Sequence, residues 1–421
     1  MNIRKTERTL RWILFSAGSL FLYVLSLESW GWFIWFIWGI LTLQNWRQNR
    51  IPVLMFHSIS DQGDWIRDQS LVTPLKSFDS QMKWIARLGY KGVFLDALYE
   101  MRKNKQAGCH CLAVTLDDGY LDNWVGAFHI LKKYNIQATV FVSTGWMDQP
   151  HLLRPKLPAC RPSQINWKGY LGPAEIAAMQ TSGLVDIQSH AVSHDDIFIS
   201  DEIVNFISPD NQPHGLYCYL YPDQKPQWLR QEIKSPLGYP IFKQGEALAE
   251  KAFIPDPGLI KQLVNAAEPP DFFASPDWKD QLINRVNDYK EIHGRLGDME
   301  SIHQAKQRWQ TELIESRQQL EKLTGKPVQH LAWPRNGYHL ESEKIALNAG
   351  YKSTTSILGL HNTPFNPHQV ERVAIVSINN PTIDTLRILL EIWVFKGFYI
   401  FWPLLFLLQR LSKFYVSRYK K

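Results

Sequence analysis

The sequence predicts an α/β domain whose parallel strands form a barrel or an open sheet, with apolar segments at both ends of the chain. Three observations lead to this prediction. Between residues 51 and 380, short apolar or β-branched runs alternate with helical patterns. From about 196 to 300 this alternation stops. Long apolar stretches occupy residues 10–43 and 385–408.

The alternating region supplies strands and helices in turn. We expect strands at 53–57, 112–116, 138–143, 185–189, 328–332, 352–356 and 372–376. We expect helices at 78–88, 122–134, 173–182, 302–323 and 341–349. Parallel strands connected in this way bring their carboxyl ends to one edge, where α/β domains build their sites.

The stretch 196–300 is rich in Pro, Gly, Asp and aromatic residues and is predicted to be an insertion into the α/β domain at 51–380. Insertions of this length in compact domains are often functional, as lids or binding surfaces.

Composition indicates a globular protein with membrane contact. The chain has 421 residues, 45% of them hydrophobic and 20% charged, which fits one large domain with appendages. The net charge is +6, and basic residues cluster at both ends beside the apolar stretches. This favours membrane anchoring over nucleic-acid binding. We therefore expect a membrane partner and no nucleic acid, while the oligomeric state stays unknown.

Residues 1–50 are predicted to be an N-terminal membrane anchor. Glu28 and Ser29 split the apolar run, whose first part has about the length of a short transmembrane helix. The second part is rich in tryptophan, which prefers the membrane interface. No small-residue cleavage site follows before Ile51, which disfavours a cleaved signal peptide.

Residues 381–421 are predicted to be a hydrophobic membrane-associated segment with a basic tail. Glu391 and Lys396 interrupt the apolar run, and Pro403 would kink it. A membrane span, an interfacial helix and a buried helix of the soluble domain all fit this pattern. We expect the protein at a bacterial inner membrane, with the side of the catalytic domain left open.

Two polar motifs follow predicted strands. TLDDG places Asp117 and Asp118 after one strand, and SHAVSH places His190 and His194 four residues apart after another. Alone, each has an ordinary explanation, as a polar turn or as two unrelated surface histidines. At one sheet edge, however, a carboxylate and two imidazoles form a three-ligand set of the kind that hydrolytic metal sites use. The other carboxylate is then available as a base.

The order and context of these motifs resemble the polysaccharide deacetylase family (NodB homology domain, carbohydrate esterase 4). TLDDG matches the family's T-F-D-D-G, and HAVSH matches its histidine motif with Ala191 at the place of a hydroxyl residue. The resemblance covers roughly residues 51–195 and 302–376. It implies a distorted (β/α)7-type barrel, with Asp117 as general base. It also implies a divalent metal ion, with zinc expected, held by Asp118, His190 and His194.

The segment VLMFHSI, residues 53–59, resembles a segment of the poly-N-acetylglucosamine deacetylase-like subgroup. That resemblance implies that His57 lies at a strand end beside the metal and takes part in catalysis. The alternative is a core or capping histidine.

The third family motif departs from its usual form. The chain reads LAWPRNGY at residues 331–338, so the strand, proline and glycine are present. By this resemblance Arg335 would orient Asp117 through a charge-assisted hydrogen bond, with Arg372 as a rival for the same role. Trp333 and Tyr338 are candidates to stack on a sugar, or are packing residues.

The late L-x-H histidine of the family, the proposed general acid, has no clean match in this sequence. His361 and His368 are the candidates, and His57 is another proton donor that we consider.

The sequence thus predicts a metal-dependent hydrolase of non-peptide carbon–nitrogen bonds. The leading hypothesis is a carbohydrate N-deacetylase acting on N-acetylated sugars of a polysaccharide or glycan. The membrane segments also fit a deacetylase or deformylase of a lipid-linked sugar. The altered third motif fits a non-catalytic carbohydrate-binding relative, although a pure binder has no need of the base Asp117.

Overall fold

The computed structural model describes residues 51–104, 110–149, 152–213, 215, 219–227, 235–357, 366 and 368–418. The predicted N-terminal anchor at 1–50 and the candidate acid His361 lie outside these residues.

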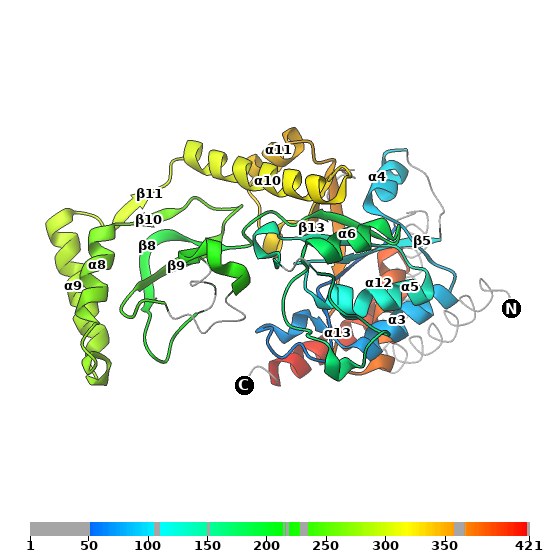
Figure 1. The fold of residues 1–421 in the computed structure, drawn as a ribbon, viewed down its shortest axis with the longest axis horizontal. Helices are drawn as coiled ribbons and strands as arrows, with labels where there is room; N and C mark the ends of the chain where they lie inside the picture. The colour runs from blue at the N-terminus through cyan, green and yellow to red at the C-terminus, as the bar shows by residue number, and fades with distance from the viewer. Residues whose placement is uncertain are drawn as a thin grey trace, which may run out of the picture.

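A closed parallel barrel forms the main body (Figure 1). Its strands are, in spatial order, β1 (Val53–Phe56), β14 (Gln369–Ala374), β13 (Ser353–Ile357), β12 (His330–Leu331), β7 (Val185–Ser189), β6 (Ala138–Val142) and β5 (Cys111–Leu116). All neighbours are parallel, and β1 also pairs with β5, which closes the ring. The eighth strand of the sheet, β4 (Lys91–Gly92), pairs with β5 outside the ring. The barrel therefore has seven strands, as the resemblance implied.

Most side chains of the barrel strands are buried, whichever face of the sheet they lie on. In β5 all six residues are buried, and Val53, Leu54 and Phe56 of β1 have no exposed area. Strands covered on both faces read as continuous apolar runs rather than as alternating patterns. This is why the sequence located all seven barrel strands. The last one, β14, begins three residues earlier than predicted, because Gln369 to Glu371 pair with β13 through their backbones.

Helices cover the outside of the barrel. They are α3 (Leu75–Arg87), α4 (Leu95–Lys103), α5 (Phe128–Tyr134), α6 (Pro173–Thr181), α10 (Ile302–Thr324) and α11 (Leu340–Asn348). A π-helical turn, η2 (Asn123–Ala127), leads into α5. The capping box of Ser301 and Gln304 starts α10, and Gly325 in the left-handed region ends it. A short parallel pair, β2 (Ser58–Ile59) and β3 (Val72–Thr73), lies beside the barrel.

The stretch predicted as an insertion has a hydrophobic core of its own. It contains the antiparallel pair β8 (Asp196–Phe206) and β9 (Pro240–Glu246), the pair β10 (Phe253–Pro255) and β11 (Gly297–Met299), and the helices α8 (Pro257–Ala266) and α9 (Trp278–His293). Phe198, Phe242, Leu259 and Leu282 are fully buried in this second core. Figure 1 shows α8 and α9 at the end of the molecule away from the barrel, with α10 running back toward it.

The C-terminal segment divides into α12 (Pro381–Phe395) and α13 (Trp402–Arg418). Ile388, Ile392 and Trp393 of α12 have no exposed area and belong to the barrel's core cluster, where α12 packs on α3. Of the alternatives for residues 385–408, the buried helix is therefore the one that α12 adopts. Within the described residues, every helix falls short of the length and apolarity needed to cross a bilayer.

Candidate metal centre and active site

The two polar motifs meet at the carboxyl edge of the barrel. Asp117 and Asp118 follow β5, and His190 follows β7, with β6 between the two strands. The ladder hydrogen bonds continue into the motifs: the Asp117 N–H donates to the Phe56 carbonyl at 2.9 Å, and the His190 N–H donates to the Val142 carbonyl at 2.9 Å. The barrel itself therefore fixes the backbone of both motifs.

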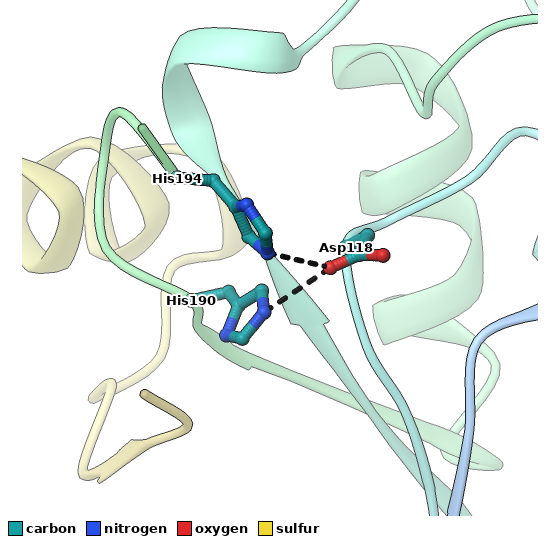
Figure 2. Close-up of side chains that lie close together, drawn as sticks. All are labelled: Asp118, His190 and His194. Carbon is teal, nitrogen blue, oxygen red and sulfur yellow. Dashed lines mark ion pairs between the residues drawn. The ribbon is translucent and has the colours of Figure 1, made fainter. Parts of the chain in front are cut away.

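Asp118, His190 and His194 converge on one point (Figure 2). Asp118 Oδ1 lies 3.2 Å from His190 Nε2 and 3.2 Å from His194 Nε2. The three atoms lie within 4.8 Å of one another. Residues separated by about 70 positions are thus brought together as the sequence predicted.

This donor set fits a divalent cation. One carboxylate and two imidazoles supply three protein ligands and leave a position open, as in catalytic zinc sites. Asp118 Oδ1 is also buried without a hydrogen-bond donor. A buried carboxylate oxygen that faces two imidazole nitrogens and lacks a donor is better satisfied by a cation than by the residues around it. Which metal it prefers is left to experiment.

Unusual backbone conformations aim these side chains. Asp118 has φ 70° and His194 has φ 51°, both in the left-handed region. Non-glycine residues in this region are uncommon and cluster at functional sites. Gly119 follows with φ 73°, and a Cβ there would meet Val142 at 3.3 Å, so the turn after Asp118 requires glycine.

His190 is fixed by the neighbouring strand. Its Nδ1 lies 2.8 Å from the Ala332 carbonyl, which has no proton, so Nδ1 carries the hydrogen and Nε2 presents its lone pair to the site. His190 is 2% exposed. Carbonyls that orient ligating histidines in this way are a recurrent feature of metal sites.

Electrostatics keep Asp118 ionised. Burial by itself raises the pKa of Asp118, but the adjacent His194 and His190 outweigh it and hold the pKa well below its usual value. Burial lowers the pKa of His194, yet the Asp118 carboxylate more than offsets this and the pKa is raised. The carboxylate is therefore available as a ligand at neutral pH.

Asp117 is paired with Arg372, not with Arg335. Arg372 Nη1 donates to Asp117 Oδ1 at 2.6 Å, and both side chains are almost fully buried. Burial raises the pKa of Asp117, but Arg372 offsets this and the net pKa is lowered. Arg372 reaches Asp117 because β14 and β5 both flank β1 in the barrel.

The predicted orienting role of Arg335 is therefore wrong, and its rival holds that position. Arg335 lies in the turn η7 (Pro334–Asn336) with φ 53°, and its guanidinium pairs with Asp196 of the insertion at 2.8 Å. The left-handed backbone turns this side chain toward the insertion.

His57 lies directly after β1, within electrostatic reach of both aspartates. Burial lowers the pKa of His57, so its imidazole is neutral near pH 7 and suited to accept a proton. Its catalytic role stays a prediction. His368 precedes β14, at the opposite barrel edge, where its Nδ1 contacts the Lys352 carbonyl. It is therefore not the general acid.

Trp333 is not available to stack on a sugar. It is 1% exposed and packs within the barrel core, where its ring stacks on Tyr338 at 5.5 Å. This pair is a packing contact, the alternative that the sequence left open.

Other aromatic residues, which the sequence did not single out, lie beside the metal ligands. We call them the aromatic cluster: Trp65, Tyr120, Trp146 and Tyr170. Tyr120 stacks on Tyr170 at 5.3 Å, and burial and the neighbouring Asp118 raise the pKa of Tyr120 well above its usual value. Tyr120 and Trp146 follow strands β5 and β6, and that position at the site edge was the available signal.

Comparisons with known proteins agree with these motifs. Residues 104–233 match the family model described as polysaccharide deacetylase, a stretch that contains all three candidate ligands and Asp117. A Bacillus subtilis (strain 168) protein, YxkH, whose name assigns it to the polysaccharide deacetylases, is 30% identical over 146 residues. That alignment covers 34% of this chain and 43% of the relative, so the chain spans less than half of that protein's length.

Solved structures with a similar course of the chain include three deacetylases. A de-N-acetylase from Aggregatibacter actinomycetemcomitans has a TM-score of 0.48 at 15% identity, covering 77% of this chain and 94% of that one. The BpsB deacetylase domain from Bordetella bronchiseptica has a TM-score of 0.45 at 17% identity, covering 77% and 95%. IcaB from Ammonifex degensii has a TM-score of 0.44 at 14% identity, covering 80% and 96%.

The match over residues 104–233 confirms the resemblance that the motifs indicated. Over this stretch the chain is similar to the polysaccharide deacetylases.

Proposed function

We propose that this protein is a metal-dependent carbohydrate deacetylase that hydrolyses the acetamide of N-acetylated sugars. The observation that carries the proposal is that two adjacent carboxylates have different partners. Asp118 faces two histidines, whereas Asp117 is held by Arg372 and stays outside the ligand set. A metal-binding scaffold alone has no use for a second, oriented carboxylate.

Asp118, His190 and His194 would hold the metal ion. When bound, a divalent ion there would supply Lewis-acid polarisation and lower the pKa of water to about 7. Asp117 accepts the proton of the attacking water, because its lowered pKa keeps it ionised at neutral pH. Arg372 fixes the direction in which Asp117 points.

The aromatic cluster would bind the sugar. Trp65, Trp146 and Tyr170 are only partly buried, so their rings retain surface beside the metal ligands. Aromatic side chains offer an apolar face together with a polar edge, which suits a sugar ring that carries both C–H and O–H groups. We propose these rings in place of Trp333 as the substrate-binding surface.

A lipid-linked sugar is a second candidate substrate, favoured by the exposed side of α13. Trp402, Phe406 and Leu407 are between 39% and 47% exposed on this helix. The Arg410 guanidinium lies 4.8 Å from the Phe406 ring centre, and the sequence continues with further basic residues. Aromatic and basic residues together suit the surface of an anionic membrane. We therefore propose that the protein works at a bacterial inner membrane, with α13 against the lipid surface.

The test is acetate release by the purified chain from chito-oligomers and from lipid-linked N-acetylated sugars, with and without a chelator. We expect release that the chelator abolishes and zinc restores. In the variant Asp117→Asn, release should fall by roughly 10²- to 10⁴-fold, the usual contribution of a general base. The same variant should still bind zinc, because Asp117 is not in the ligand set.

Two results would contradict this proposal. Full activity in Asp117→Asn would remove the assigned base. Sugar binding without any acetate release by the wild-type chain would favour the non-catalytic alternative.

A further inference from the structure

A buried lysine of the insertion reaches the loop that carries His194. Lys225 lies in the short helix η5 (Pro222–Gln227) and is 2% exposed. Its Nζ donates to the Ser193 carbonyl at 3.0 Å and to Asp195 Oδ2 at 2.7 Å. These two acceptors belong to the residues immediately before and after His194, so one ammonium group fixes the chain on both sides of a candidate metal ligand.

The barrel side holds only the first residues of this loop: the Thr144 and Gly145 amides, just after β6, donate to the Ala191 and Val192 carbonyls at 3.1 Å and 2.9 Å, and His194 lies beyond them. β7 ends at Ser189, and His194 lies five residues beyond it with φ 51°. A histidine in this conformation is held there by its surroundings rather than by its own preference. Further contacts of the loop include the Trp146 indole N–H, which donates to the Ser193 carbonyl at 2.8 Å, and Glu312, which accepts from the Val192 and Ser193 amides.

We propose that Lys225 is a positioning residue of the metal centre, through which the insertion holds His194 at the ligating position. This inference rests on the metal site proposed above. It gives the insertion a role in the chemistry of the barrel although its core is separate. An ammonium group withdrawn from water requires such partners, and the two it has here are the groups that flank His194.

The competing explanation is that Lys225 and Asp195 form a structural ion pair and nothing more. Buried ion pairs are weak evidence of stabilisation, since the loss of hydration offsets their attraction. A structural pair would affect the unfolding of the metal-free chain and leave zinc affinity unchanged. A positioning residue would change zinc affinity in a chain that is still folded.

The experiment is a competition titration of zinc against a chromophoric chelator, on the full chain with Lys225→Met. We expect zinc to bind roughly 10- to 100-fold more weakly, the range for residues that orient metal ligands. Lys225→Arg, which keeps a cation at this position, should recover part of the loss. The matched control is Lys243→Met, because Lys243 also belongs to the insertion and pairs with Glu202 but is exposed.

Circular dichroism and urea unfolding of the metal-free variants show whether each is folded. If Lys225→Met does not fold, the double variant Lys225→Met with Asp195→Asn decides, because it leaves no unpaired buried charge. Wild-type zinc affinity in a folded variant would overturn the proposal, and so would a wild-type chain that binds no zinc. If zinc affinity depends on Lys225 but the wild-type chain releases no acetate, only the proposed function is overturned.

Discussion

His190 and His194 point at the same carboxylate oxygen, but different parts of the molecule hold them. His190 directly follows strand β7 and is almost fully buried. Its ring is fixed by the carbonyl of Ala332, the residue that follows the neighbouring strand β12. His194 lies on a loop, its side chain is 23% exposed, and its neighbours are held by Lys225 and Glu312. The first position is set by the closed barrel, and the second depends on contacts from α10, the insertion and the residues after β6.

This difference separates two sources of order in one candidate metal centre. Parallel strands fix the groups at their carboxyl ends wherever the barrel closes, so those groups need few additional contacts. A loop ligand requires oriented supports, and in metal sites these supports are conserved in function almost as ligands are. We therefore expect the position of His190 to be insensitive to substitutions outside the barrel. The position of His194 should change when distant residues that support its loop are substituted.

The largest effect should come from removing the ligands one at a time. His190→Ala should weaken zinc binding by roughly 100- to 1000-fold, since about 10–16 kcal/mol is shared among four ligands in zinc sites. His194→Ala should cost about tenfold less, because water can occupy the more exposed loop position as a replacement ligand. Isothermal titration with zinc measures both.

The ranking is what tests the comparison. An equal loss in both variants, or a larger loss for His194→Ala, would show that the loop is as rigid as the strand end. Far-ultraviolet circular dichroism serves as the control for folding.

The next effect concerns the base rather than the ligands. Arg372→Met removes the cation that lowers the pKa of Asp117, so that pKa should rise and the acid limb of the kcat profile should move to higher pH. At neutral pH we expect a loss of roughly 10- to 100-fold, part of what a general base supplies. Measuring kcat for acetate release from pH 4 to pH 9 gives the position of this acid limb.

Arg372→Lys is the matched variant, because it keeps the charge but not the planar guanidinium. Arg372→Met could unfold the protein, since removing one partner of a buried ion pair lowers stability by about 3–5 kcal/mol. Arg372→Lys avoids most of this loss because it keeps a cation beside Asp117. An acid limb that stays in place in a folded Arg372→Met variant would show that Asp117 does not control the reaction.

The sequence predicted the barrel well because barrel strands are buried on both faces. Their apolar runs are local signals, and so are the capped helices between them. The C-terminal segment was harder: α12 is largely apolar because it is buried against α3, and a buried helix and a membrane-associated helix give similar patterns.

For the site, the ligands were predictable and their supports were not. Asp118, His190 and His194 follow strands and carry their own motif. The pairing of Arg372 with Asp117 joins residues 255 positions apart, and no local pattern distinguishes Arg372 from Arg335. The prediction that Trp333 contacts a sugar was wrong because Trp333 is buried. The sequence around an aromatic residue near a motif does not show whether its ring faces solvent.

The smallest effect should come from the second support of the loop. Glu312 of α10 accepts hydrogen bonds from the Val192 and Ser193 amides at 3.2 Å and 3.1 Å. Glu312→Gln keeps one acceptor oxygen but removes the charge, and hydrogen bonds to charged groups are stronger by about 1 kcal/mol.

We therefore expect zinc affinity to fall by only about fivefold in Glu312→Gln, the equivalent of about 1 kcal/mol. Glu315→Gln is the matched control, one turn along the same helix and exposed, and it should bind zinc like the wild type. In Glu312→Gln combined with Lys225→Met, the loss should exceed the sum of the separate free-energy changes, because both supports hold Ser193. Strictly additive losses would mean that the two residues act on separate parts of the loop, and that His194 is not held by a shared clamp.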